Sequence, residues 1–174
     1  MPVSPEKMDL GELCLTLYNE YRTAHPNRKL VFKTEGDLSG NWDCDRLRQA
    51  ISNVLGNGVQ HSPDDALIEL SVTGQPESVM VKVYNGGPSI GSGELATIFE
   101  PLVRGSSSGQ LRSNRPGSIG LGLYIAREVA NAHGGTLTVT SSDEHGTEFT
   151  FKVPRSFTPN ALQTVLNEKQ MVGM

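Results

Sequence analysis

Two asparagine side chains on one predicted helix are the residues of this sequence best suited to hold a metal ion. The helix is expected to be capped by Asp43 or Asp45 and to run to about His61. Asn53 and Asn57 lie one turn apart on it and share a face. An amide oxygen is a neutral, hard ligand that suits Mg²⁺, which tends to keep waters and to share the phosphates of a nucleotide. A solvated polar face of an ordinary helix is the open alternative, since the amides belong to a longer polar stripe: Gln49, Asn53, Asn57, Gln60 and His61.

The same helix contains residues that local propensity disfavours. Gly56 and Gly58 each cost about 1 kcal/mol relative to alanine in a helix interior, and asparagine is a poor helix former. Such disagreement between propensity and pattern often marks a functional site.

Glycine is the main compositional excess of the sequence. The chain has 19 glycines in 174 residues, and nine of them lie between Gly86 and Gly122. The first group follows a predicted strand, in the run from Asn85 to Ile90, where bare glycines let the backbone approach a flat ligand closely. The Asn85 amide oxygen can accept a hydrogen bond from an exocyclic amine there. Taken alone, this run also fits a plain tight turn.

A second glycine-rich stretch leads into the last long predicted helix. The loop from Gly105 to Gly117 contains Arg112 and Arg115 and no acidic residue, a composition that by itself also fits a linker. The run from Gly117 to Leu123 then opens directly into a helix. Free N–H groups and the positive dipole end of that first turn can bind phosphates. The run has no G-K-[ST] and follows no strand, so it is neither the lysine-bearing phosphate loop nor the dinucleotide fingerprint.

Composition excludes several classes of protein. With 36% hydrophobic and 20% charged residues, the chain suffices for one domain with a sizeable core. A net charge of −4 argues against a nucleic-acid-binding surface. No apolar run approaches the ~20 residues of a membrane helix and no signal peptide opens the chain, so we expect a cytoplasmic domain without direct membrane contact. Cys14 and Cys44 lie in segments that look helical, and neither has a motif around it, so neither a disulfide scaffold nor a zinc site is expected.

The hydrophobic spacing predicts an α+β fold, a two-layer α/β sandwich with three helices on one face of the sheet. A leader at residues 1–8, a domain at residues 9–154 and a tail at residues 155–174 are expected, with Asn160 able to cap a short helix in the tail. The segment from Gly36 to Gly40 is expected to be a turn into Trp42. Helices are predicted at Asp9 to about His25, Asp45 to about His61, Glu94 to Phe99 and Leu121 to His133. Strands are predicted at Lys29–Lys33, Ala66–Val72, Val79–Tyr84, Thr136–Thr140 and Thr147–Val153.

In this order, the segments resemble the catalytic ATP-binding domain of sensor histidine kinases. Their superfamily includes gyrase, the ninety-kilodalton heat-shock chaperone and MutL. The resemblance extends from about Leu10 to Pro154 and implies the ATPase fold of that superfamily, with a mixed, mostly antiparallel sheet. The residues within its motifs are similar to those of kinases of the bacteriophytochrome type. Five segments carry it: DRLRQAISNVLGNGVQHSP (Asp45–Pro63, the N box), YNGGPSI (Tyr84–Ile90, the G1 box), IFEPLVRG (Ile98–Gly105, the F box), GSIGLGLYIAREVANAHGG (Gly117–Gly135, the G2 box) and GTEF (Gly146–Phe149).

The resemblance implies a role for each matching residue. Asn57 is the expected Mg²⁺ ligand, with Asn53 as its companion on the same face. Asn85 stands in the place of the aspartate that reads adenine, Gly87 supports the ring, and Thr147 helps through its hydroxyl or a water. The expected phosphate contacts come from the backbone of Gly120, Leu121, Gly122 and Leu123 and from Arg104, Arg112 and Arg115, while Phe99 anchors the base of the lid.

Several positions depart from the family's pattern. Asn85 replaces the usual aspartate and has donors to offer guanine as well, which leaves the preference for ATP open. Ser89 replaces the third glycine of the G1 box. Gln60 stands where a basic residue is usual and His61 where an aromatic is common, so phosphate contacts are expected to shift to the arginines, with His61 able to stack or hydrogen-bond. Asn53 stands where hydrolytic relatives carry a general-base glutamate, which favours phosphoryl transfer over hydrolysis.

The activity that the resemblance implies is that of a protein histidine kinase which binds Mg-ATP. None of the four histidines lies in a segment like the family's phospho-acceptor box, so the acceptor is expected on a dimerisation and phosphotransfer helical module upstream in a larger kinase. A response-regulator receiver domain is expected to take the phosphoryl group onto an aspartate. Two alternatives stay open: a degenerate nucleotide-sensing regulatory domain, and an anti-sigma-type serine kinase with the same superfamily fold.

Overall fold

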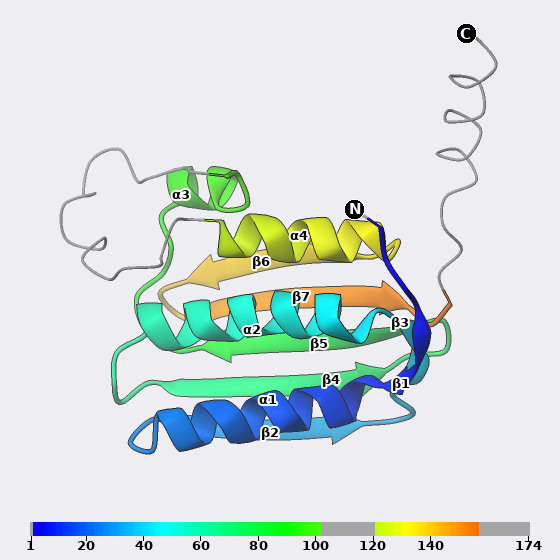
Figure 1. Ribbon diagram of the computed structural model, residues 1–174. Coiled ribbons are helices and arrows are strands. Elements are labelled where there is room, and N and C mark those ends of the chain that lie inside the picture. Colours follow the sequence, from blue (N-terminus) through cyan, green and yellow to red (C-terminus); the bar gives the residue numbers. More distant parts are fainter. Residues whose placement is uncertain (1, 102–120, 157–174) are drawn as a thin grey trace, which may run out of the picture.

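The computed structural model describes residues 2–101 and 121–156. Three long helices lie side by side across a sheet, and a short helix lies at one end (Figure 1). In chain order the elements are β1 (Glu6–Asp9), α1 (Leu10–Ala24), β2 (Lys29–Glu35), β3 (Ser39–Trp42), α2 (Cys44–His61), β4 (Leu67–Gly74), β5 (Ser78–Asn85), α3 (Ser92–Thr97), α4 (Gly122–Ala132), β6 (Thr136–Ser142) and β7 (Gly146–Pro154).

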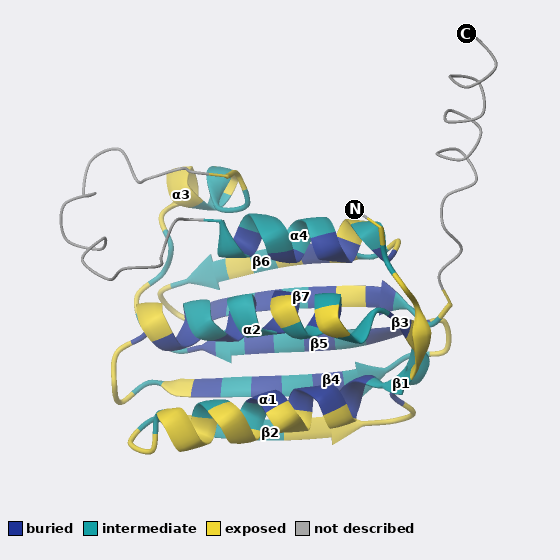
Figure 2. Cartoon of the chain, viewed as in Figure 1, coloured by how far each residue is buried: buried dark blue, intermediate teal, exposed yellow. Residues whose placement is uncertain are grey.

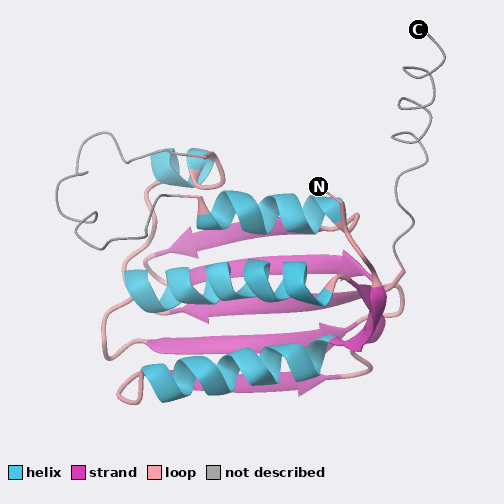
Figure 3. Cartoon of the chain, viewed as in Figure 1, coloured by secondary structure: helices cyan, strands magenta, loops and turns pink. Residues whose placement is uncertain are grey.

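The main sheet has five strands in the order β2-β4-β5-β7-β6. Among the described strands only β2 and β4 run parallel, and the other neighbours are antiparallel. A parallel pair needs a crossover connection, which α2 supplies here. Helices α1, α2 and α4 form one layer over the strands (Figure 3). The predicted two-layer α+β sandwich with a mixed, mostly antiparallel sheet is therefore confirmed.

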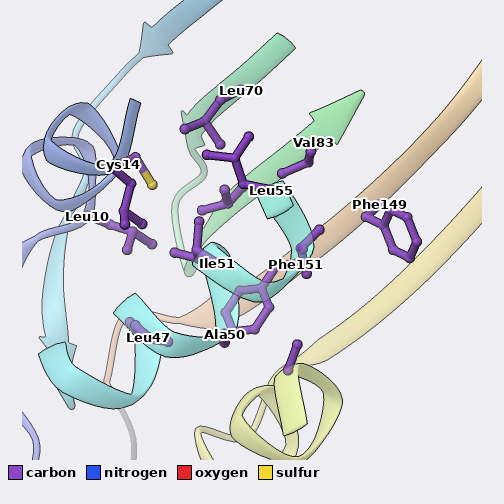
Figure 4. Close-up of a cluster of buried hydrophobic side chains, with 14 of the residues drawn as sticks. Leu10, Cys14, Leu47, Ala50, Ile51, Leu55, Leu70, Val83, Phe149 and Phe151 are labelled. Carbon is purple, nitrogen blue, oxygen red and sulfur yellow. The ribbon is translucent and has the colours of Figure 1, made fainter. Parts of the chain in front are cut away.

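The core lies between the helix layer and the sheet. Side chains alternate along β5 and β7, so every second residue is buried toward the helices (Figure 2). The apolar stripe predicted on α2 packs onto them, with Ile51 and Leu55 beside Val83 and Phe151 in Figure 4. The stripe residues Leu47, Ile51, Val54 and Leu55 are all buried. This packing fixes which face of α2 is left for polar side chains.

Two aspartates begin two of the long helices. Asp9 Oδ1 accepts from the Glu12 N–H at 3.0 Å, and Asp43 Oδ1 accepts from the Arg46 N–H at 3.1 Å, as N-caps do. Of the two caps considered for the second helix, Asp43 is the one used. Burial alone would raise the pKa of Asp43, but N–H bonds from Ser4 and Arg46 hold it below its ordinary value. At pH values above the ordinary aspartate pKa, this cap therefore stabilises the fold. That stabilisation is lost only as the pH falls through the lowered pKa of Asp43.

A second, two-stranded sheet corrects two expectations. Glu6–Asp9 pairs antiparallel with Ser39–Trp42, so residues 6–8 are not a leader and residues 39–40 are not part of a turn. The reason is Trp42, which is fully buried and whose ring lies against Gly40, only 2.3 Å from where a Cβ would be. Ser-Gly-Asn has the composition of a turn, but the strand is held by pairing and by this ring.

Arg155 belongs to the domain rather than to the expected tail. Its guanidinium donates to the carbonyl oxygens of Asp37, Ser39 and Gln75, each at 2.7 Å. The end of β7 is thereby tied to the β2–β3 connection and to the β4–β5 hairpin. The boundary predicted after Pro154 cuts through this network.

We expect Gly135→Ala to destabilise the fold strongly. A Cβ at position 135 would lie 2.0 Å from the backbone oxygen of Lys152 in β7, which cannot move without distorting the sheet. The expected loss is about 2–3 kcal/mol in the free energy of unfolding, measured by urea denaturation. Gly91→Ala is the matched control, because nothing lies within 4 Å of a Cβ there. Equal stability of the two variants would contradict this packing.

Candidate functional site

Asn53 joins the middle of α2 to the start of α4. Its Nδ2 donates to the backbone oxygen of Gly122 at 3.0 Å. Because a carbonyl can only accept, this contact sets the orientation of the amide and directs its Oδ1 away from Gly122. Asn57 lies one turn further along α2 and is half-buried. The two predicted amides therefore lie along the part of α2 that leads away from the start of α4.

The first turn of α4 presents backbone N–H groups beside these amides. Leu121 precedes the helix in a helical conformation, and no described side chain caps it. The N–H groups of Gly122 and Leu123 thus have no partner within the helix, and its dipole favours an anion there. The Leu123 side chain is buried in the core, so its backbone is the part that can meet a ligand.

Asn85 lies at the other end of the site, as the last residue of β5. Its side chain is buried, and its Nδ2 donates to the Gly86 oxygen at 3.3 Å. Its Oδ1 lies 3.6 Å from where a Cβ of Gly58 would be. A side chain larger than alanine at position 58 would displace the amide. The room that the Asn85 side chain needs therefore explains why glycine, which is unfavourable in a helix, occupies position 58.

The turn after β5 packs against the end of α2. Gly87 has φ +120°, and a Cβ there would lie 2.6 Å from Pro63 Cδ, so conformation and space both require glycine. Arg28 holds the same end of α2 by donating to the oxygens of Val59 at 2.9 Å and Pro63 at 3.1 Å. A cation at this position also complements the negative end of the helix dipole. The end of α2 and the turn at Gly87 therefore pack as one unit.

Thr147 lies beside Asn85 across the β5–β7 ladder, where the two residues are Cα partners. Its side chain is buried, and its Oγ1 lies 2.7 Å from Ser141 Oγ. Ser141 Oγ also accepts from the Ile90 N–H at 2.9 Å. The hydroxyl expected to help bind a ligand is thus held by β6.

The remaining predicted site residues fall into two groups. Gln60 and His61 are exposed on the last turn of α2. Arg104, Arg112, Arg115 and Gly120 lie outside the described residues. Phe99, expected to anchor the base of the lid, packs edge-on against Phe149 with ring centroids 6.2 Å apart.

Sequence reasoning missed Arg28, Ser141 and Asp143. Arg28 contacts carbonyl groups more than 30 positions away along the chain, and Asp143 contacts Ser89 from 54 positions away. No local motif surrounds any of the three. Contacts this distant depend on how the turns are brought together by the sheet, so only the fold reveals them.

The architecture and the site together define a class of nucleotide-binding domain. A buried amide ends one strand, and a polar-faced helix leads from it to a second helix that opens on a glycine. The chain belongs to the family described as histidine kinase-, DNA gyrase B- and HSP90-like ATPase, whose family model matches residues 42–156, more than half of the chain. The resemblance seen in the ordered motifs is therefore confirmed.

Known relatives and solved structures agree with this family assignment. The chain is 30% identical to the probable sensor histidine kinase TcrY of Mycobacterium tuberculosis, over 88% of this chain and 32% of TcrY. It is 29% identical to a bacteriophytochrome of Pseudomonas aeruginosa, over 83% of this chain and 19% of that protein, consistent with the expected similarity. The catalytic domain of the histidine kinase ThkA has 26% identity and a TM-score of 0.73, with 88% of this chain and 97% of that chain covered. The chain thus spans a third or less of these two curated relatives.

Within residues 2–101 and 121–156, no helix is long and apolar enough to cross a membrane.

Proposed function

We propose that this chain is the ATP-binding catalytic domain of a sensor histidine kinase, which donates the γ-phosphoryl group of Mg-ATP to a histidine on a separate dimerisation module. One observation carries the proposal. Helix α2 lies beside the buried Asn85 at Gly58 and is hydrogen-bonded to the first turn of α4 through Asn53. A nucleotide laid along α2 has an amide for its base at one end and backbone N–H groups for its phosphates at the other.

The proposed contacts follow this direction. At the base end, Asn85 Oδ1 accepts from the exocyclic amine of adenine, and Gly87 lets the backbone approach the ring. Thr147 adds a hydroxyl that Ser141 already orients. At the phosphate end, backbone N–H groups of the run 120–123 and the arginines at positions 104, 112 and 115 balance the negative charge. Gln60 and His61 lie at the exposed end of α2.

The amide pair fits Mg²⁺. The ion is usually bound by one or two protein oxygens, with substrate phosphates and water completing its shell. Asn57 provides the proposed ligand and Asn53 the companion, since the Asn53 Oδ1 is directed away from Gly122. Among the described residues, no group of three or more His, Cys, Asp or Glu side chains could hold a metal. When bound with the nucleotide, the ion neutralises charge on the transferred group.

The residues beside the phosphates favour transfer to a protein acceptor over hydrolysis. Phosphoryl transfer needs positioning and charge neutralisation more than covalent help from the protein. Hydrolysis needs a base to activate water, and an amide at Asn53 cannot accept a proton at neutral pH. Its Nδ2 is also committed to the Gly122 carbonyl. An acceptor histidine, which is itself a nucleophile, needs no such base at this position.

A receiver domain is the proposed second partner. ThkA, at 25% identity to this chain, has been solved in a complex with the response regulator protein TrrA. That structure supports the proposal that a receiver domain takes the phosphoryl group from the acceptor histidine. The two alternative functions differ in product: a regulatory nucleotide sensor transfers nothing, and a serine kinase forms an acid-stable phosphoserine in place of an acid-labile phosphohistidine.

Changes at Asn85 test the base end of the site. We expect Asn85→Ala to weaken ATP binding by about tenfold, because a buried hydrogen-bond partner of the base is lost. Asn85→Asp removes the donors that guanine can use, so it should raise the preference for ATP over GTP. Isothermal titration calorimetry with both nucleotides measures the two effects, with the exposed Asn131→Ala as control. An unchanged ATP/GTP ratio in Asn85→Asp would contradict the assignment of this residue.

A further inference from the structure

A hydrogen-bonded bridge links the turn after β5 to the turn between β6 and β7. Asp143 Oδ1 accepts from both the backbone N–H and the hydroxyl of Ser89, at 3.0 and 2.7 Å. The N–H of the next residue, Ile90, donates to Ser141 Oγ at 2.9 Å. Two successive backbone N–H groups of the turn after β5 are therefore bonded by two side chains. One is Ser141 of β6 and the other is Asp143 of the β6–β7 turn.

The bridge continues into the proposed nucleotide site. Ser141 Oγ lies 2.7 Å from the buried Thr147 Oγ1, and Thr147 pairs with Asn85 across the β5–β7 ladder. Asn85 in turn begins the run that leads through Gly87 to Ser89. The contacts thus close a ring around the base end of the site, from Asn85 along its turn, across the bridge and back through Thr147.

We propose that Asp143 and Ser141 are positioning residues for the nucleotide, which hold the turn at residues 86–90 in the geometry that receives the base. The inference rests on the proposed function. Ser89 stands where the family pattern has glycine, and its hydroxyl adds a second bond to the same Asp143 oxygen. The departure from the pattern thereby gains a role.

The location of the bridge favours pre-organisation over bulk stability. Asp143 is exposed and Ser89 is only half-buried, so water competes for their bonds and folding gains little from them. The hydroxyl of Ser89, and then its N–H, hold the pKa of Asp143 below its usual range, so the carboxylate stays ionised at neutral and mildly acid pH. A turn already held in its bound geometry loses less conformational freedom on binding. The effect of the bridge should therefore appear in affinity.

Calorimetric titration of the full chain with nucleotides tests the proposal. Asp143→Ala should weaken ATP binding by about threefold to tenfold, at most about 1.4 kcal/mol. Because the bridge acts at the base end, ADP and adenosine should lose affinity by the same factor as ATP. Glu144→Ala is the matched control, since it removes the same charge from the neighbouring exposed position, where the 3.8 Å contact of the Glu144 carboxylate with His145 Nε2 stays within the turn. Ser89→Ala combined with Asp143→Ala should add little to the loss from Asp143→Ala alone.

A second measurement reports the bridge without nucleotide. In an NMR titration of the Asp143 carboxyl, Ser89→Gly should raise its pKa toward the ordinary value, because the largest cause of the lowering is removed. Equal ATP affinity of Asp143→Ala and Glu144→Ala, in a chain that binds ATP, would overturn the proposal, as would an unchanged pKa in Ser89→Gly. A wild-type chain that binds no ATP, with the pKa shift present, would instead overturn the proposed function.

Discussion

Replacing Asn57 with alanine is expected to lower phosphoryl transfer by about 100-fold or more when Mg²⁺ is limiting. Asn57 is the proposed metal ligand, and the ion supplies charge neutralisation that the protein cannot replace from this face of α2. A 100-fold loss corresponds to about 2.7 kcal/mol of transition-state stabilisation. The measurement is the rate of transfer from Mg-ATP to the isolated acceptor module over a range of Mg²⁺ concentrations. Asn57→Ala should shift the half-saturating Mg²⁺ concentration upward as well as lower the rate.

Two further variants define the Asn57 experiment. Asn57→Asp retains an oxygen ligand, so it should keep more of the Mg²⁺ dependence than Asn57→Ala does. Asn19→Ala removes an exposed asparagine from another helix, α1, and should behave as wild type. If Asn57→Ala bound Mg-ATP with wild-type affinity at limiting Mg²⁺, the metal assignment would be wrong.

Trp42→Ala is expected to cause the largest loss of stability, about 3–5 kcal/mol in the free energy of unfolding. The side chain is fully buried, and its Nε1 donates to the Pro154 oxygen at 2.7 Å, which joins β3 to the end of β7. Urea denaturation followed by circular dichroism measures the change. Trp42→Phe should cost about 1–2 kcal/mol, because it keeps most of the apolar contact but leaves the carbonyl without its donor.

The stability experiment has its own control. Leu15 is a large apolar residue that is 44% exposed, so Leu15→Ala should change the free energy of unfolding by no more than about 0.5 kcal/mol. β3 lies at the end of the sandwich opposite α3 and the start of α4 (Figure 1), so folded Trp42→Phe should bind ATP as wild type does. A Trp42→Ala variant as stable as Leu15→Ala would show that the small sheet contributes little to the fold.

The elements that the sequence predicts well are those with a strong local pattern. The spacing of Leu10, Leu13 and Leu17 predicts α1, and these side chains are buried as the pattern requires. The strand Ser39–Trp42 is missed because Ser, Gly and Asn are typical of turns. Its real determinants are a buried indole and the partner strand Glu6–Asp9, whose paired residues lie 30 to 36 positions away along the chain. Local propensity contains neither contact.

The candidate site divides in the same way. Asn85, Gly87 and Asn53 could be picked out from the order of the motifs. In the structure Asn85 lies beside Gly58 of α2, Gly87 lies beside Pro63 after α2, and Asn53 bonds to Gly122 at the start of α4. The space beside Gly58 and the Ser89–Asp143 bridge could not be predicted, because each depends on which turns the sheet brings together. The roles of the site residues stay predictions that the variants above test.

The most direct test of the proposed function is a transfer experiment with γ-labelled ATP, Mg²⁺, this chain and the isolated helical acceptor module. The expected product is an acid-labile phosphohistidine on the module, formed with wild-type chain and Asn19→Ala and reduced about 100-fold or more with Asn57→Ala at limiting Mg²⁺. A receiver domain added afterwards should remove the label from the module. Label in an acid-stable phosphoserine, or ATP binding without any transfer, would contradict the proposal that the chain is the catalytic domain of a histidine kinase.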